Sequence, residues 1–560
     1  MKRLLHKKHF KKFFYFMCFF ILCICDQRIG SALGEIQLVC PNIVLMVLSC
    51  MTLSHYPFSC FRSRWFWIPA IISTAGAGLA LGLIWPNVYY HYQLISGVIA
   101  AVLYGCVLIQ TARAIFSAKR LPRGSHLGLL LLGLLLVWIL LSAHDKYNGF
   151  LLCLSVVLMY LTDFTEQEYD WMLRALGGAV LTAFFIFQGL AFVFRPYDTL
   201  RYLGLYANTN INALFYQMVY CVFLGFFCIL ELKKEHCLLK WGSFCFSCAM
   251  WSFVLLTMCR SAIAGMAAAT VLGFGVTLLK QRGKRLRRGL LCVCGLLIGI
   301  VAGFPVVYGA VRYLPAVFHH PVWFMDEYSE EKVHSWDPYD SEKYTDWREV
   351  LQGNFGRFFL DAASADMGPD WGVVPETAGE GDESGFVPEG APAILLASRE
   401  TGALPGKAVS GEDMASKAAP PGEENSIDFR IAIYRHYLSQ LNLRGHADSE
   451  NGIQVNDDYY APHAHNIFLQ YAFNYGLPAG ILLLAYLAVS GIRFLVLCVR
   501  NETDMPFLPG LLLFASIAVF GMLEIVWRNG QLSHTLLLLL PRFAWQCRLD
   551  KASRKTESKL

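Results

Sequence analysis

Residues 210–230 read NINALFYQMVYCVFLGFFCIL, an almost unbroken apolar run. A helix needs about 20 apolar residues to cross the roughly 30 Å hydrocarbon core of a bilayer, and this stretch is long enough. The whole 560-residue chain has a similar bias, because 56% of its residues are hydrophobic and only 16% are charged. Soluble globular proteins carry about 25% charged residues. The sequence therefore predicts an all-α, polytopic membrane protein.

Apolar runs of this kind predict about 14 transmembrane helices. They lie at residues 13–26, 36–54, 66–85, 94–115, 127–142, 149–163, 172–194, 210–230, 241–258, 262–279, 289–310, 466–497, 507–527 and 530–545. Short cytoplasmic loops carry an excess of Lys and Arg. The basic clusters fall on one side if both termini are cytoplasmic; they lie at Lys2–Lys12, Arg62–Arg64, Arg113–Arg123, Lys233–Lys240, Lys280–Arg288 and Arg542–Lys559.

Residues 1–33 have a second interpretation. Their basic start, apolar core and small residues near Ser31 and Ala32 also match a cleaved signal peptide. We favour an uncleaved first helix, because the basic loops alternate correctly when this helix is counted.

Residues 311–462 are predicted to form one large non-cytoplasmic loop. Its middle, 361–425, holds thirteen acidic and three basic residues and has no helical or strand periodicity, so we expect this insertion to be disordered. The following stretch, 427–443, reads IDFRIAIYRHYLSQLNL. Helical spacing predicts an amphipathic helix on the membrane face or across the loop. Its predicted apolar face consists of Ile427, Ile431, Tyr434, Leu438 and Leu441.

Two polar motifs lie at predicted outer ends of membrane helices. The first, RYLGLYANTN at 201–210, leads into an apolar helix for which Asn208 or Asn210 is a natural N-cap. A helix start also offers free N–H groups and a positive dipole end to an anion. The second is Arg260-Ser261, in a hairpin between two apolar runs. An arginine there either extends to lipid phosphate or faces a functional cavity.

A third motif pairs Arg430 with the segment APHAHNIFLQ at 461–470. The H-x-H spacing of His463 and His465 allows a metal site completed by Asp457 and Asp458. The alternative is that these histidines are solvated loop residues. Such spacing is common by chance, so we expect no metal here.

The motifs resemble the O-antigen ligase and O-antigen polymerase superfamily of bacterial membrane glycosyltransferases. The resemblance rests on RYLGLYANTN at 201–210, TMCRSAIAG at 257–265, RIAIYRHYL at 430–438 and HAHNIFLQYAFNYGLPAG at 463–480. It covers about residues 200–545. The family's hairpin usually reads Ser-Arg-Gly, whereas this chain has Cys259-Arg260-Ser261.

The resemblance implies a GT-C-like membrane fold and a division of the chain into three parts. Residues 1–200 would form N-terminal transmembrane helices, 201–545 an O-antigen ligase-like catalytic membrane region, and 546–560 a basic cytoplasmic tail. The enzyme would lie in the bacterial cytoplasmic membrane and act on its outer face, in cell-surface polysaccharide biosynthesis. Its donor would be an oligosaccharide on undecaprenyl pyrophosphate, and its acceptor a hydroxyl of a glycan or glycolipid. Membrane lipid is a further expected partner, and nucleic acid is not.

The same residues suit this chemistry. Arginine binds phosphate oxygens in a planar, bidentate manner, so Arg430 and Arg260 are expected to stabilise the departing pyrophosphate. His465 matches the family histidine by preceding Asn466, and we assign it the role of general base, with His463 as second choice. Asn466 is expected to cap its helix and to hold the ring of His465. Arg430 and His465 are therefore the predicted catalytic residues; the predicted substrate-binding residues are Arg260, Arg201, Asn210, Asn466 and His463.

One base and one displacement at the anomeric carbon predict inversion of configuration. No metal or cofactor is expected, because the arginines take the place of a cation. A ligase and a polymerase share all these residues and differ only in the acceptor. Two other functions remain open: a protein O-oligosaccharyltransferase, and a flippase or transporter of lipid-linked oligosaccharide. A flippase needs charged residues along a path through the membrane, whereas the notable polar residues here gather at one face.

Overall fold

The computed structural model describes most of the chain between residues 2 and 546. The described residues are 2–27, 34–54, 67–68, 71–72, 75, 91–118, 126–142, 152–157, 166–193, 201–205, 209–234, 236–281, 285–318, 322–325, 332–335, 347–348, 350–351, 353–354, 427–446, 453–456, 459–461, 463–500, 507–524 and 532–546. The predicted disordered insertion at 361–425 and most of the predicted span at 66–85 lie outside these residues.

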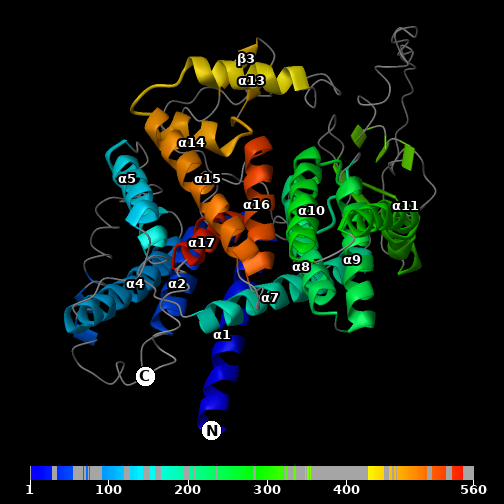
Figure 1. Cartoon of the computed structure of the whole chain (residues 1–560). Coiled ribbons are helices and arrows are strands. Elements are labelled where there is room, and N and C mark those ends of the chain that lie inside the picture. The colour runs from blue at the N-terminus through cyan, green and yellow to red at the C-terminus, as the bar shows by residue number, and fades with distance from the viewer. Residues whose placement is uncertain are drawn as a thin grey trace, which may run out of the picture.

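Helices make up nearly all of the described secondary structure (Figure 1). The helices are α1 (Lys2–Gln27), α2 (Gly34–Leu53), α4 (His91–Ala118), α5 (His126–Ser142), α7 (Glu166–Val193), α8 (Thr209–Lys233), α9 (Cys237–Leu256), α10 (Arg260–Lys280), α11 (Arg285–Val317), α13 (Ile427–Ser439), α14 (Ile467–Tyr475), α15 (Leu477–Arg500), α16 (Phe507–Leu523) and α17 (Leu532–Gln546). The remaining described elements are two small antiparallel hairpins. In one, β1 (Val322–Met325) pairs with β2 (Lys332–Ser335), and in the other, β3 (Ile453–Asn456) pairs with β4 (Tyr459–Ala461).

Six of the described helices are long and apolar enough to cross a membrane, namely α7, α8, α9, α10, α11 and α15. Shorter apolar helices accompany them, including α16. The prediction of an all-α chain with several helices able to cross a membrane is therefore confirmed.

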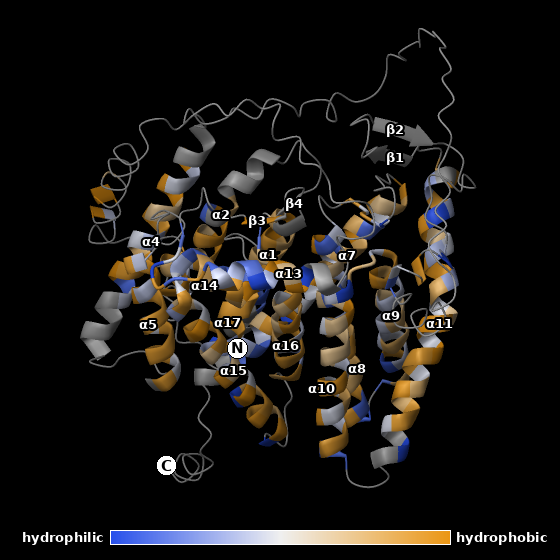
Figure 2. Ribbon diagram, turned by 90° about the horizontal axis from the view of Figure 1, so that it is seen from above, coloured by the Kyte–Doolittle hydropathy of each residue, from blue (hydrophilic) through white to orange (hydrophobic). Residues whose placement is uncertain are grey.

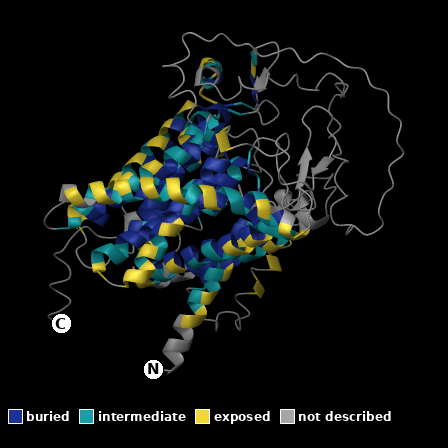
Figure 3. Ribbon diagram, turned by 90° about the vertical axis from the view of Figure 1, so that its right-hand side faces the viewer, coloured by how far each residue is buried: buried dark blue, intermediate teal, exposed yellow. Residues whose placement is uncertain are grey.

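Side-chain burial shows that α8 is a central helix and α11 a peripheral one. Most of the α8 side chains are buried, and α8 packs against α9, α10 and α16. In contrast, α11 lies at the edge of the bundle and carries a long hydrophobic stretch (Figure 2), in which Ile298 and Val301 are 69% and 74% exposed. Buried residues gather inside the bundle and exposed ones on its outside (Figure 3). Exposed apolar surface of this extent suits contact with lipid tails.

The predicted span at 466–497 is wrong, because the structure divides it into α14 and α15. The break falls at Gly476, whose φ of 90° lies in the left-handed region that glycine tolerates best. Pro478 follows in the first turn of α15, where proline's missing N–H costs no hydrogen bond. Residues 467–475 therefore form a separate short helix, α14, before the membrane-span candidate α15.

Helix α13 is confirmed, but its predicted apolar face is only partly right, because Tyr434 and Leu441 face the molecule and two other members do not. Ile431 and Leu438 are 39% and 57% exposed, whereas Ile433 and Tyr437 are buried. The Tyr437 ring packs on Phe473 of α14, with centroids 4.8 Å apart. The helix face that packs against the rest of the protein is therefore the one that contains Ile433 and Tyr437. This face also includes the half-buried Arg430.

Two glycines fix α13 over the break between α14 and α15 (Figure 1). Gly445 and Gly476 both have positive φ, and a Cβ on Gly476 would overlap the Leu443 carbonyl. The backbones also exchange hydrogen bonds, His446 N to Phe473 O and Leu477 N to Asn442 O, each 2.9 Å. This contact positions α13 relative to the loop that carries the predicted catalytic histidine.

Candidate functional site

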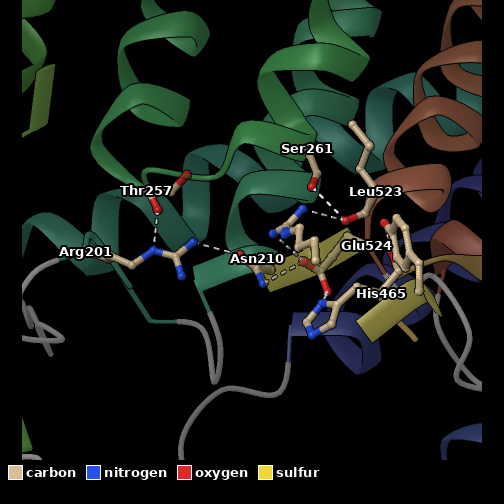
Figure 4. A network of polar contacts seen from close by, with 9 residues as sticks. Arg201, Asn210, Thr257, Ser261, His465, Leu523 and Glu524 are labelled. Atoms are coloured by element: carbon tan, nitrogen blue, oxygen red, sulfur yellow. Dashed lines mark hydrogen bonds and ion pairs between the residues drawn. The ribbon is translucent and has the colours of Figure 1, made fainter. Parts of the chain in front are cut away.

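Several helix ends meet beneath α13. The starts of α8, α10 and α14 gather with the ends of α9 and α16, and side chains from these termini form one polar network (Figure 4). Unpaired backbone groups accumulate wherever helices end. Such a convergence therefore needs polar side chains, and it also places helix dipoles around one point.

A buried carboxylate, Glu524, lies at the centre of this network (Figure 4). Glu524 directly follows α16. Its Oε1 lies 2.9 Å from Nδ1 of His465. On the other side, its Oε2 accepts a 3.3 Å hydrogen bond from Asn210 Nδ2 and lies 3.8 Å from Arg430 Nη2. One acid thus joins three of the predicted site residues.

The contacts of Glu524 favour its ionised form. Its carboxylate accepts a hydrogen bond from Asn210, and the Arg430 guanidinium and the His465 ring lie next to its two oxygens. An ionised carboxylate only accepts hydrogen bonds. Nδ1 of His465 is therefore the donor, so in the neutral form of the ring Nε2 carries the lone pair that a base needs.

The carboxyl end of α16 binds side chains from three other segments. The Leu523 carbonyl accepts hydrogen bonds from Arg430 Nη1 at 3.0 Å and from Ser261 Oγ at 3.2 Å. The Met522 carbonyl accepts one from Asn466 Nδ2 at 2.8 Å. Arginine suits this position, because the last carbonyls of a helix carry partial negative charge. These bonds fix the guanidinium of Arg430 near Glu524.

A second arginine, Arg201, is connected to the network by its hydrogen bond to Asn210. Arg201 Nε donates to the Thr257 carbonyl at 2.8 Å, and its Nη2 donates to Asn210 Oδ1, also at 2.8 Å (Figure 4). Asn210 lies inside α8, which begins at Thr209, so its expected role as N-cap is wrong. Its amide instead links Arg201 to Glu524. Asn208 lies outside the described residues.

The backbone of His465 has an unusual conformation. Its φ of 46° lies in the left-handed region, which costs a non-glycine residue about 1–3 kcal/mol and is concentrated at functional sites. Tyr434 of α13 donates to the His465 carbonyl at 3.2 Å. Asn466 caps α14 by accepting from the amides of Phe468 and Leu469, as predicted. Its amide contacts Met522 instead of the His465 ring, so that part of the prediction is wrong.

The other predicted residues occupy different positions. The His463 ring stands nearly perpendicular to that of His465, with centroids 4.2 Å apart. Arg260 opens α10, beside the network residue Ser261, and its Nη2 donates to the Gly353 carbonyl at 3.0 Å. This bond ties the α9–α10 hairpin to the segment around residue 353. Asp457 and Asp458, the alternative metal ligands, lie outside the described residues.

Glu524 is not among the site residues predicted from the sequence. A signal was present, because Glu524 is the only charged residue in the apolar stretch 507–527. Ionisable residues in membrane helices are costly and usually functional. Its partners, however, are distant in sequence: His465 lies 59 residues away and Asn210 lies 314 residues away.

These contacts create an oriented imidazole next to guanidinium groups. With neutral histidines, Arg201, Arg430 and Glu524 leave the network with one net positive charge. Such a site suits the binding of an anion and the removal of a proton from a neighbouring hydroxyl. No protein-family model, curated protein or solved structure matches this chain.

Proposed function

We propose that this chain transfers an oligosaccharide from an undecaprenyl-pyrophosphate-linked donor to an acceptor hydroxyl on the outer face of the bacterial cytoplasmic membrane. The observation that carries this proposal is the hydrogen bond of His465 to the buried Glu524, within reach of Arg430. A base beside fixed cations matches a reaction in which a hydroxyl loses a proton while a phosphate leaves.

In the proposed reaction, Nε2 of His465 takes the proton of the acceptor hydroxyl. The hydroxyl oxygen attacks the anomeric carbon, and the bond from that carbon to the pyrophosphate oxygen breaks with inversion. The lipid pyrophosphate leaves with the electron pair and remains in the membrane. Glu524 stabilises the imidazolium that forms, as a carboxylate does when it orients a catalytic histidine.

Arg430 is the main candidate for binding the departing phosphate. A guanidinium has five N–H donors, and the bond to Leu523 uses only one of them. Arg201, held by Thr257 and Asn210, supplies a second cation to the same network. Arg260 begins the neighbouring helix α10 and is proposed to bind the donor further from the reacting carbon.

The proposed topology has fourteen spans, with both termini in the cytoplasm and the loop 311–462 outside. The helix ends around Glu524 would then all face the outer leaflet, where the lipid-linked donor is presented. This arrangement agrees with the alternation of basic loops along the sequence.

The test uses purified protein in liposomes with a radiolabelled undecaprenyl-pyrophosphate oligosaccharide from the native host and candidate acceptors. Wild type is compared with His465→Ala, and with His436→Ala as a control at another half-buried histidine, on α13. We expect wild type and the control to release undecaprenyl pyrophosphate and glycosylate the acceptor, and His465→Ala to lose this activity.

The products distinguish the related functions. A ladder of glycans identifies a polymerase, a single capped product a ligase, and a glycosylated polypeptide a protein O-oligosaccharyltransferase. Movement of labelled lipid between leaflets without transfer would reject the proposal in favour of a flippase. Full transfer by His465→Ala would show that another group is the base.

A further inference from the structure

Three potential metal ligands converge beside the proposed base. His463, His465 and Glu524 each present one ligand atom, and these atoms lie within 4.8 Å of one another. The two histidines come from the loop before α14, and the carboxylate comes from the end of α16. Segments distant in sequence therefore supply a compact set of two nitrogens and one oxygen.

This set matches a particular class of ion. Imidazole nitrogens combined with a carboxylate oxygen suit zinc and its neighbours among the divalent transition metals, whereas calcium and magnesium prefer oxygen ligands alone. Three protein ligands also leave a fourth tetrahedral position for water. The two histidine side chains are half-buried, and Nδ1 of His463 is itself buried.

Admitting the ion requires shifts of the three side chains, whose ligand atoms lie within 4.8 Å of one another. His465 Nδ1 and Glu524 Oε1 are 2.9 Å apart. Zinc bonds of about 2.0–2.2 Å in tetrahedral geometry separate two ligand atoms by about 3.4 Å, so this pair must open by roughly half an ångström. The ion would replace the proton that now lies between them.

Arg430 lowers the expected affinity for a cation but does not block the metal site. Arg430 lies 3.8 Å from Oε2, and Asn210 also contacts Oε2, whereas the proposed ligand is Oε1. The positive charge of Arg430 weakens cation binding, but it does not occupy the ligand atom.

We propose that His463, His465 and Glu524 bind a divalent transition-metal ion, such as Zn²⁺, that inhibits the protein. The bound ion occupies Nδ1 of His465, so the neutral ring carries its proton on Nε2 and can no longer accept the proton of the acceptor hydroxyl. The metal site stands on geometry alone, whereas its inhibitory effect rests on the proposed transferase function. The ion is a regulator and not a cofactor of the reaction.

Binding is tested with Co²⁺ as a spectroscopic probe on full-length protein in detergent, purified without a histidine tag. Equilibrium dialysis gives the stoichiometry, and visible absorption reports tetrahedral coordination. We expect one saturable ion in wild type. His463→Gln and Glu524→Gln should each weaken binding by more than about tenfold, because even the loss of an outer-shell partner costs about 10–100-fold. His436→Gln, a control on α13, should bind like wild type.

Thermal unfolding without metal checks that each variant is folded. Absence of saturable Co²⁺ binding, or unchanged binding in folded His463→Gln, would overturn the proposed site. This assay needs neither donor nor acceptor, so its outcome is independent of the transferase. If Co²⁺ binds as expected but Zn²⁺ leaves active wild type uninhibited, the regulatory role fails and the site stands.

Discussion

Replacing Glu524 with glutamine tests whether the carboxylate sets the position of the proton on His465. The amide keeps the shape of the side chain but has one acceptor and one donor end. Donors from Asn210 and Arg430 face Oε2 at 3.3 and 3.8 Å, whereas Oε1 faces the imidazole of His465. The amide oxygen should therefore turn to Asn210 and Arg430, and the amide NH₂ should donate to Nδ1 of His465.

The expected loss of rate follows from this reversal. When Nδ1 accepts, the proton moves to Nε2, and the ring can no longer take the acceptor's proton. General base catalysis contributes roughly 10²–10⁴ in rate, so Glu524→Gln should lower the rate of transfer by about this factor. Glu524→Ala leaves the tautomer free and removes the charge-assisted hydrogen bond to the His465 ring, worth about 1.5–3 kcal/mol. The conservative glutamine change should therefore be at least as damaging as alanine.

Single-turnover rates in liposomes provide the measurement, for wild type, Glu524→Gln, His465→Ala and the double variant. If Glu524 acts through His465, the double variant should be no slower than His465→Ala, since residues that act as a unit are non-additive. Losses that multiply in the double variant would refute this reasoning, and so would a glutamine variant much faster than alanine. Thermal unfolding in detergent would confirm that all variants are folded.

Other predictions concern the arginine, a glycine, the insertion and metal. Arg430→Lys keeps the charge but loses the planar fork, and transfer assays should give a rate about 10–150-fold lower, as expected for the loss of one charged hydrogen bond. Gly476→Ala forces a positive φ and an overlap with Leu443, so thermal unfolding should show a loss of at least about 1–3 kcal/mol; Gly189→Ala in α7, where a Cβ meets nothing within 4 Å, should not destabilise. Deleting residues 363–424, whose composition predicts no core, should leave the amount of membrane-inserted protein unchanged on immunoblots. Prolonged EDTA treatment should not reduce transfer, and an EDTA-sensitive enzyme restored by zinc would show that a metal is required.

Apolar runs predicted the helices well, because the length and hydrophobicity that a membrane helix needs are properties of one continuous stretch of sequence. A run that is long and uncharged must lie in lipid or in a core, and the observed α7–α11 agree with the predicted spans to within several residues. The break at Gly476 was also present in the sequence as Tyr475-Gly-Leu-Pro478. It was missed because the surrounding residues remain apolar, so hydropathy alone records one continuous span.

The face of α13 and the role of Glu524 depend on tertiary structure. Apolar residues at 431, 433, 434, 437 and 438 allow more than one helical stripe, and contact with Phe473 selects the stripe that contains Tyr437. Glu524 is recognisable in sequence as an isolated acid. No local pattern, however, indicates that its partners are His465 and Asn210, because folding alone brings these segments together.

The capping of α16 has a consequence for biogenesis. The Leu523 carbonyl obtains its hydrogen bonds from Ser261 and Arg430, which belong to segments synthesised earlier. Until α16 has been inserted, Arg430 and His465 lack the partners that orient them. A chain whose synthesis stops before Glu524 would therefore carry most of the bundle but no assembled site. The proposed transferase would therefore stay inactive until its synthesis is nearly complete.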